Sequence, residues 1–389
     1  MERFDVAVIG AGPAGSMAAK YASKAGASTI MLEEHAGPGS PVQCAGLLGI
    51  KAIEESELLP GGFMIHGVKG ASICSPGSKV SFKSGSWKAW VVDRRIFDRE
   101  MALEALRNGS ELRLKSVVRD VTRDHSKSTI TLGSGRSIQA DVVISAEGVK
   151  AYLARKAGIR PPEKVLSGAQ VEALFSLDDP EKVEVHLGAA PGLFAWVIPA
   201  ENGAARIGLC ARENACDYLQ TFLKKDEIRS RLLGSPFSLV TGGLPLGPPA
   251  SAVADGFMAV GDAAGQVKPI SGGGIYPGLV CAKIAGSLAA AASQEGDCSA
   301  KRLMEYDKRW RAAIGLELEI GMRVNRLMER MTKEDLDEVL GCFLRRKSLT
   351  RIIEQHGDID RPSLLMARLL PWLGIDGIRL ARLLRYALG

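Results

Sequence analysis

The sequence predicts an α/β protein that combines a Rossmann-like nucleotide-binding domain, a β-sheet substrate domain and a C-terminal helical region. The first domain is predicted by a strand, a glycine-rich turn and a helix within residues 4–25, and by a second glycine-rich turn at residues 261–274. Short strand-like segments in the middle of the chain predict the second domain, and a helical pattern after residue 300 predicts the last region. A chain of 389 residues suits two or three domains at about 100–200 residues each.

The composition is that of a folded protein without a predicted membrane span or disulfide framework. Hydrophobic residues make up 46% and charged residues 24% of the chain, and no uninterrupted apolar run reaches the roughly 18 residues that cross a bilayer. The first apolar segment, residues 4–10, is short and contains Asp5, so it does not resemble a signal peptide. The seven cysteines lack C-x-x-C spacing, which argues against a zinc ribbon or an iron–sulfur cluster. We therefore expect a cytoplasmic protein.

The first glycine-rich turn lies in the order of elements that a dinucleotide-binding unit requires. Residues 4–9 are an apolar strand, residues 10–15 read Gly-Ala-Gly-Pro-Ala-Gly, and residues 16–25 follow as a helix. A second strand at residues 28–32 ends at Glu33. This order of strand, turn, helix, strand and carboxylate makes the motif a specific indicator of dinucleotide binding, whereas G-x-G-x-x-G alone is a weak indicator.

Each residue type in this turn has a physical reason. Gly10 allows the tight turn, Gly12 lets the backbone approach a pyrophosphate, and Gly15 lets the helix and strand pack closely. The helix N-terminus faces the phosphates. Glu33 is placed to accept hydrogen bonds from ribose hydroxyls, and it is preferred to Glu34 because it directly follows the strand.

The second glycine-rich turn favours one dinucleotide over another. A short apolar strand at residues 256–260 runs into Gly-Asp-Ala-Ala-Gly, and three glycines at residues 272–274 precede a helix. Asp262 directly follows the strand and is placed to hydrogen-bond a ribityl hydroxyl, and the helix N-terminus favours negative charge on a reduced flavin. Two such elements about 250 residues apart fit FAD better than NAD.

Four segments in order along the chain resemble one family of flavoproteins. The chain is similar to FAD-dependent oxidoreductases of the glutathione-reductase and p-hydroxybenzoate-hydroxylase type, and within them to the geranylgeranyl reductase family, including digeranylgeranylglycerophospholipid reductases. The segments are P-V-Q-C-A-G at 41–46, D-R-R-I-F-D at 93–98, F-A-W-V-I-P at 194–199, and G-D-A-A-G with S-G-G-G-I at 261–275. The combination is specific, although each segment alone is not.

The resemblance implies an FAD-dependent reductase that saturates C=C bonds of geranylgeranyl or other polyprenyl chains in isoprenoid lipids. It places Cys44 at the reaction centre, where a thiol that is protonated at neutral pH could serve as a proton donor. The other interpretation of Cys44 is a buried cysteine packed as a small hydrophobic residue. Such a reaction suits an apolar tunnel with few polar groups.

The resemblance also implies further binding residues. Phe194 and Trp196 share one face of a strand, which would line a lipid tunnel or belong to the core, and Tyr276 would lie above the flavin ring. Arg94 would contact FAD or form an ion pair with Asp98 in a helix. The FAD-binding residues implied are Gly10, Gly12, Ala14, Gly15, Glu33, Cys44, Ala45, Arg94, Val118, Asp262, Gly274 and Ile275, with Val118 at the end of a strand over residues 111–118.

Departures from related motifs leave alternatives open. Glu147 and Ala151 replace the Asp and Ser of the hydroxylases' D-G-x-x-S-x-x-R motif, which weakens a monooxygenase reading and leaves ferredoxin or NAD(P)H as electron donor. Ile198 and Ala200 depart from the geranylgeranyl reductase pattern beside the substrate. The alternatives are a hydroxylase, a halogenase, a quinone-linked dehydrogenase or a non-enzymatic prenyl-binding protein. The five histidines have no metal-binding spacing.

The domains are predicted to be interleaved along the chain. The FAD-binding domain comprises residues 1–60, 90–165 and 245–300, and the substrate domain, expected to be an antiparallel sheet, comprises 61–89 and 166–244. The helical region comprises 301–389. The strands expected in the substrate domain are residues 68–74, 79–82, 184–187, 194–198 and 205–210.

The net charge of +6 is concentrated near the C-terminus. Residues 345–389 contain nine basic and four acidic side chains, a balance of +5, which leaves +1 for the rest. Leucines at 380, 383, 384 and 388 share one face of a predicted helix flanked by arginines. We expect this segment to bind an anionic membrane surface peripherally, or else to cap the domain, and we expect no nucleic-acid partner.

Overall fold

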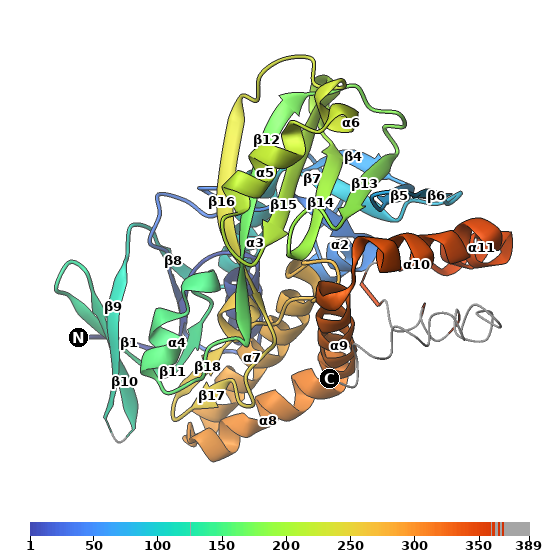
Figure 1. The fold of residues 1–389 in the computed structure, drawn as a ribbon. Coiled ribbons are helices and arrows are strands. Elements are labelled where there is room, and N and C mark those ends of the chain that lie inside the picture. The colour runs from blue at the N-terminus through green and yellow to red at the C-terminus, as the bar shows by residue number, and fades with distance from the viewer. Residues whose placement is uncertain (125, 359, 362–364, 366–367, 369–389) are drawn as a thin grey trace.

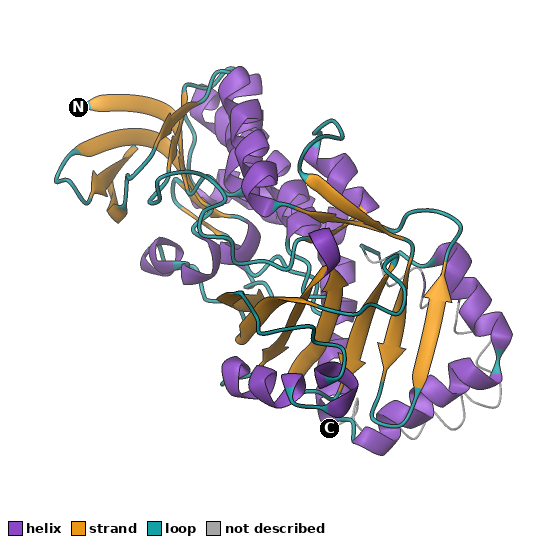
Figure 2. Cartoon of the chain, turned by 90° about the horizontal axis from the view of Figure 1, so that it is seen from above, coloured by secondary structure: helices purple, strands orange, loops and turns teal. Residues whose placement is uncertain are grey.

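The computed structural model describes the chain except for residues 125, 359, 362–364, 366–367 and 369–389 (Figure 1). The predicted basic helix at 380–388 therefore lies outside the described residues. Two large sheets form separate layers, with long helices beside the first and the C-terminal helices extending from the second (Figures 1 and 2).

The first sheet carries the nucleotide-binding unit. The order of its central strands is β17-β18-β11-β1-β2-β8, and the β9–β10 hairpin is attached to β11. β1 pairs in parallel with β2 and β11, and β11 pairs in parallel with β18, so the carboxyl ends of these four strands lie at one edge. The strands are β1 (Glu2–Ile9), β2 (Thr29–Leu32), β8 (Glu111–Arg113), β9 (Val118–Asp124), β10 (Lys127–Leu132), β11 (Ser137–Ser145), β17 (Val253–Ala254) and β18 (Phe257–Ala259).

Small residues let two helices pack closely beside this sheet. A Cβ on Gly286 of α7 would stand 2.1 Å from the carbonyl oxygen of Ala18 in α1, so only glycine allows this approach. Among the described helices, α7 has the length and apolar composition to cross a bilayer, but most of it is buried inside the protein. The helices of this half are α1 (Pro13–Lys24), α2 (Ile50–Ser56), α3 (Arg94–Arg107), α4 (Tyr152–Lys156), α7 (Ile275–Glu295) and α8 (Ala300–Trp310).

The second sheet is the predicted substrate sheet, in the order β16-β12-β15-β14-β13-β5-β6. Buried side chains of α5 (Ala215–Leu223) pack on one of its faces, and α6 (Asp226–Arg229) follows α5. A smaller sheet has the order β3-β7-β4. The strands are β3 (Leu47–Gly49), β4 (Met64–Val68), β5 (Gly70–Cys74), β6 (Lys79–Lys83), β7 (Ala89–Val92), β12 (Lys164–Leu174), β13 (Lys182–Leu187), β14 (Gly192–Pro199), β15 (Ala204–Ala211) and β16 (Ser238–Leu246).

Two details of this sheet differ from the prediction. The strand expected at 68–74 is two strands, because the chain leaves the small sheet at Lys69, whose N–H donates to the carbonyl of Glu181. The sheet is also not wholly antiparallel: β5 and β13 pair in parallel. More than 100 residues separate these strands, so the chain has the length that a parallel connection needs. In the structure, the strands of this sheet lie within residues 70–83 and 164–246. The division of the chain into domains stays a prediction.

The C-terminal region is helical, as predicted, over the part that the structure describes up to His356. A π-helical turn over Arg311–Gly315 joins α8 to α9 (Leu316–Arg330), and α10 (Lys333–Arg345) and α11 (Lys347–His356) follow. Thr332 caps α10 through a capping box with Asp335. Leu340 of α10 packs on Val80 and Phe82 of β6, which attaches this pair of helices to the edge of the second sheet.

Candidate functional site

A pocket of about 620 Å³, here called the nucleotide pocket, lies at the carboxyl edge of the first sheet. Parallel strands end there, so the turns after β1, β2, β11 and β18 meet although they are far apart in sequence. Of the predicted cofactor residues, those that line it are Gly10, Gly12, Ala14, Gly15, Glu33, Cys44, Arg94, Val118, Asp262, Gly274 and Ile275.

The glycines of the first turn fit a bound pyrophosphate. Gly10 has a φ of +98°, and a Cβ there would stand 2.4 Å from the carbonyl oxygen of Ala146. A Cβ on Gly15 would stand 1.9 Å from the oxygen of Gly10. By contrast, apart from Gly12 and its two chain neighbours, no heavy atom of the described residues lies within 4 Å of where a Cβ on Gly12 would be, so the backbone at the start of α1 faces open space.

Glu33 connects the end of β2 to the glycine-rich turn. Its Oε2 accepts the Ala11 N–H at 2.9 Å, and its Oε1 accepts the His35 N–H at 2.9 Å. The carboxylate is buried, yet it lines the nucleotide pocket, where its remaining lone pairs suit ribose hydroxyls. Glu34 is more exposed and pairs instead with Lys150 at 2.7 Å.

Asp262 and Arg94 place two ionisable side chains in the nucleotide pocket. Burial raises the pKa of Asp262, and the positive charge of Arg94 opposes that shift. The Arg94 guanidinium donates to both carboxylate oxygens of Asp98 at 2.7 and 2.9 Å. Burial alone would lower the pKa of Arg94, but Asp98 and Cys44 outweigh it and raise that pKa, so Arg94 is charged. Arg94 therefore forms the predicted ion pair with Asp98 and also lines the nucleotide pocket, while its contact with FAD stays a prediction.

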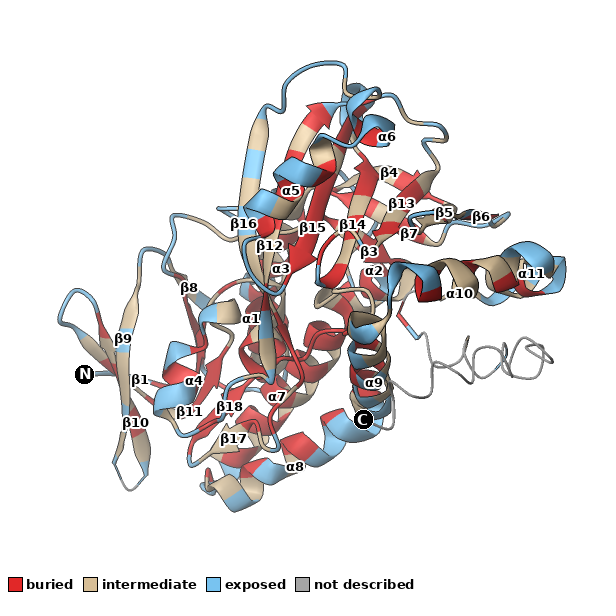
Figure 3. Cartoon of the chain, in the orientation of Figure 1, coloured by how far each residue is buried: buried red, intermediate tan, exposed pale blue. Residues whose placement is uncertain are grey.

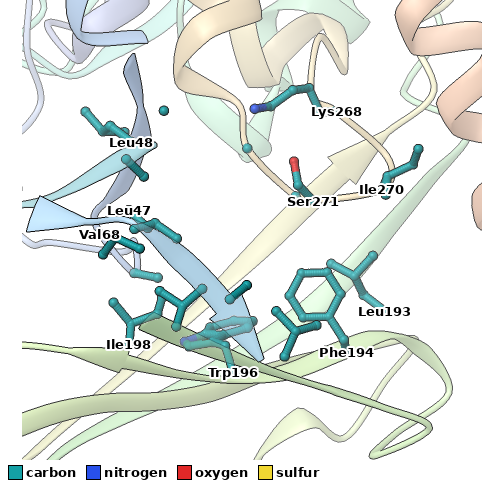
Figure 4. A pocket seen from close by; sticks show the side chains of 18 of the residues that line it. Leu47, Leu48, Val68, Leu193, Phe194, Trp196, Ile198, Lys268, Ile270 and Ser271 are labelled. Atoms are coloured by element: carbon teal, nitrogen blue, oxygen red, sulfur yellow. The ribbon is translucent and has the colours of Figure 1, made fainter. Parts of the chain in front are cut away.

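A second cavity of about 610 Å³, here called the apolar cavity, lies between the second sheet and the nucleotide pocket (Figure 4). Apolar side chains from several strands point into it, among them those of Leu47, Val68, Leu193, Phe194, Trp196 and Ile198. Cys44, Gly272, Gly274 and Ile275 line both cavities, so these residues are where the two meet.

Hydrogen bonds orient the residues around this junction. The Cys44 thiol accepts the Gly46 N–H at 3.3 Å, and Arg206 of β15 donates to the Ala45 carbonyl at 2.8 Å. The Trp196 indole N–H donates to Gln170 at 2.9 Å, which directs its ring over the cavity wall. Tyr276 also lines the apolar cavity. The arrangement can hold an apolar chain beside a nucleotide cofactor.

Two predicted residues lie differently from expectation. Ala45 lines the apolar cavity rather than the nucleotide pocket, with its carbonyl bound by Arg206, and its contact with FAD stays a prediction. Val118 lines the nucleotide pocket but begins β9 instead of ending a strand. The expected strand breaks after Arg113, because the N–H groups of Lys115 and Ser116 donate to the carbonyls of His35 and Glu33.

Sequence reasoning missed several residues of the apolar cavity. Lys268 pairs with Asp360 at 2.5 Å, and both side chains are buried in the cavity wall. Gln170, which also lines the cavity, and Arg206, which binds the Ala45 carbonyl beside it, were missed as well, because their partners lie far away in the chain and no local motif signals them. Among the described residues, no three His, Cys, Asp or Glu side chains are grouped so that they could hold a metal ion.

Comparisons with known proteins agree with this geometry. Residues 5–170 match the model of the family described as glucose inhibited division protein A. The chain is 35% identical to a digeranylgeranylglycerophospholipid reductase of Methanocaldococcus jannaschii, covering 93% of this chain and 96% of that protein. It is also 35% identical to the protein of the same name from Methanococcus aeolicus, covering 86% and 88%. The chain belongs to the digeranylgeranylglycerophospholipid reductase family.

Solved structures share the fold of this chain. A geranylgeranyl bacteriochlorophyll reductase-like protein from Thermoplasma acidophilum superposes with a TM-score of 0.84 at 25% identity, over 98% of this chain and all of that one. The halogenase PltM is 15% identical and superposes with a TM-score of 0.70, over 91% of this chain and 84% of the halogenase chain. At this identity the likeness shows a shared fold alone. FAD is the cofactor, and the nucleotide pocket, with its glycine cradle, Glu33 and Asp262, fits it.

Proposed function

We propose that this protein is an FAD-dependent reductase that saturates C=C bonds in the geranylgeranyl or related polyprenyl chains of isoprenoid lipids. The observation that carries the proposal is the junction of the apolar cavity with the nucleotide pocket, which both Cys44 and the residues Gly272, Gly274 and Ile275 line. Relatives at 35% identity over most of the chain are named digeranylgeranylglycerophospholipid reductases, which supports a lipid of this class as the substrate.

The residues divide the work of such a reaction. Reduced FAD would supply a hydride to one alkene carbon, and the other carbon needs a proton. The apolar side chains around Trp196 bind the polyprenyl chain and exclude water. Few polar groups then lie near the charge that develops on the alkene during the reaction. Cys44 lies where the two cavities meet, and its thiol would hold the proton for the second carbon.

An anaerobic mixing experiment tests this function. The FAD-loaded protein is reduced chemically, excess reductant is removed, and a geranylgeranyl glycerophospholipid in detergent micelles is added without oxygen. Return of the absorbance of oxidised flavin at a rate that depends on lipid concentration supports the proposal. A fully saturated lipid of the same headgroup is the control and should give no oxidation. Oxidation that requires oxygen instead of the lipid would contradict the proposal and favour a hydroxylase or halogenase.

We also propose that the electrons come from ferredoxin or NAD(P)H. The carboxylate of Glu147 accepts the Ser145 hydroxyl at 2.6 Å and the N–H groups of Leu153 and Ala154 at 3.0 and 3.1 Å. It thereby caps α4, which gives this departure from the hydroxylase motif a structural role. This leaves a protein donor such as ferredoxin compatible with the site.

The membrane surface is the other partner that we propose. Residues 362–389 hold the basic leucine-rich segment predicted from the sequence, and their charge suits an anionic bilayer that also holds the lipid. We expect full-length protein to co-sediment with anionic vesicles, and a version ending at Arg361 to bind them at least several-fold more weakly. Neutral vesicles are the control. Equal binding by both versions would contradict this role and the peripheral membrane location.

A further inference from the structure

We propose that Tyr306 of α8, acting through Gln266, is a positioning residue for FAD: the pair holds the turn that presents Asp262 to the cofactor. Tyr306 lies in the C-terminal helical region, 44 positions after Asp262, and it does not line the nucleotide pocket. The proposal concerns cofactor binding and does not depend on which lipid is reduced.

A continuous chain of hydrogen bonds leads from α8 to this turn. The Tyr306 hydroxyl donates to the carbonyl of Ala259, the last residue of β18, at 3.0 Å. The same hydroxyl accepts from Nε2 of Gln266 at 2.8 Å. Oε1 of Gln266 in turn accepts the Gly261 N–H at 2.8 Å, and the Gln266 N–H donates to the Gly261 carbonyl at 3.0 Å. Gln266 therefore holds Gly261 by both of its backbone polar groups.

Burial makes these bonds hard to replace with water. Tyr306 and Gln266 are both 0% exposed, in the packed region where α8 contacts β17 and β18 (Figure 3). Burial, assisted by the nearby Cys281, raises the pKa of Tyr306 well above its ordinary value, so the hydroxyl keeps the proton that it donates. If the hydroxyl were removed, the Ala259 carbonyl and one N–H of Gln266 would be left buried without a partner.

Gly261 is the point through which this support reaches the cofactor. It has a φ of +62°, and Asp262 follows it in the turn Gly261–Ala264. Oδ1 of Asp262 stands 2.9 Å from where a Cβ on Gly274 would be, so the carboxylate lies against the start of α7. A shift of Gly261 would consequently move Asp262 relative to the residues at the α7 N-terminus, which also line the nucleotide pocket.

Trp310 supplies a matched control on the same helix. It is also fully buried, and its indole N–H donates to Asp307 at 2.8 Å. Asp307 accepts from Ser251 and from the N–H of Ala252, which lie before β17, so this bond fastens α8 without reaching Gly261. Trp310→Phe should therefore weaken the packing of α8 while leaving the Asp262 turn in place.

The experiment compares the FAD-loaded forms of wild type, Tyr306→Phe and Trp310→Phe. FAD dissociation constants are measured from the fluorescence of released cofactor, together with the visible spectrum of bound flavin and the melting temperature. Losing both buried hydrogen bonds of the Tyr306 hydroxyl should weaken FAD binding at least about tenfold in Tyr306→Phe and shift its flavin spectrum. Trp310→Phe should lower the melting temperature but keep FAD affinity within about twofold of wild type.

Two results would overturn the proposal. One is wild-type FAD affinity and spectrum in Tyr306→Phe. The other is the same loss of affinity in both variants, which would make Tyr306 an ordinary part of the scaffold. If Tyr306→Phe does not fold, Gln266→Met removes both side-chain bonds at similar volume, and it is judged by the same two criteria against Trp310→Phe.

Discussion

At the scale of single residues, the proposed chemistry depends on Cys44. It lines both the nucleotide pocket and the apolar cavity, and the charged Arg94 guanidinium lies close enough to interact with it. Cys210 lines the same apolar cavity from β15, but burial raises the pKa of its thiol to about 12 and it does not line the nucleotide pocket. Both cysteines therefore line the apolar cavity, but Cys44 also lines the nucleotide pocket and Cys210 does not.

We expect Cys44→Ala to keep bound FAD and to lose lipid turnover. A positioned proton donor contributes about 10²–10⁴ to a rate, so turnover should fall by at least about 100-fold. Cys216→Ala is the control, because Cys216 is exposed on α5, away from both cavities, and turnover should be unchanged. Steady-state rates with the geranylgeranyl lipid measure both. Wild-type turnover in Cys44→Ala would leave this thiol as a packing residue.

At the scale of elements, a buried ion pair fastens the segment after α6 to the second sheet. Arg231 donates to both carboxylate oxygens of Glu184 in β13, at 3.0 and 2.6 Å, and Nε2 of His186 lies 3.2 Å from the same carboxylate. Burial acts to raise the pKa of Glu184, but hydrogen bonds from His186 and Arg231 outweigh it and lower that pKa to about 2. Because the pKa of Glu184 is lower in the folded state, the ion pair stabilises the fold fully at pH values above the ordinary pKa of a glutamate. This stabilisation disappears as the pH falls toward the folded-state pKa.

Arg231→Met should therefore destabilise the protein in a pH-dependent way. Breaking a buried pair by removing one partner costs about 3 kcal/mol, which urea denaturation at pH 7 would measure. In wild type the stabilisation should decline as pH falls from about 4.5 toward about 2, and the variant should lack most of that dependence. Lys79→Met is the control, because its pair with Asp178 is exposed and should change stability by less than about 1 kcal/mol. Equal effects of the two substitutions would contradict this account.

The elements also show how far sequence reasoning reaches. The glycine-rich turns, Glu33 and Asp262 were predictable, because turn chemistry and its spacing are local in the sequence. The parallel pairing of β5 with β13, the support of Trp196 by Gln170 and the clamp of Arg206 on Ala45 join residues distant in the chain, so no local pattern encodes them. Val118 lines the nucleotide pocket, and its contact with FAD stays a prediction. Its strand was predicted wrongly, because the turn before it is stabilised by carbonyls of residues 33 and 35.

At the scale of the whole molecule, function depends on how the interleaved segments meet. The first sheet gathers four strand ends into the nucleotide pocket, and the second sheet contributes one wall of the apolar cavity. The segment that contains Cys44 and the glycines at 272–274 lie between the two. An apolar chain in the cavity would thus be next to the cofactor while the protein shields both from water.

The measurement that tests this account most directly is the mass of the lipid recovered from the anaerobic mixture of reduced protein and geranylgeranyl glycerophospholipid. The account predicts a gain of two hydrogens for each double bond reduced, with one flavin oxidised per bond and none of this product in Cys44→Ala. An unchanged lipid mass while the flavin is oxidised, or a product that has gained oxygen or halogen when air and halide are supplied, would contradict it.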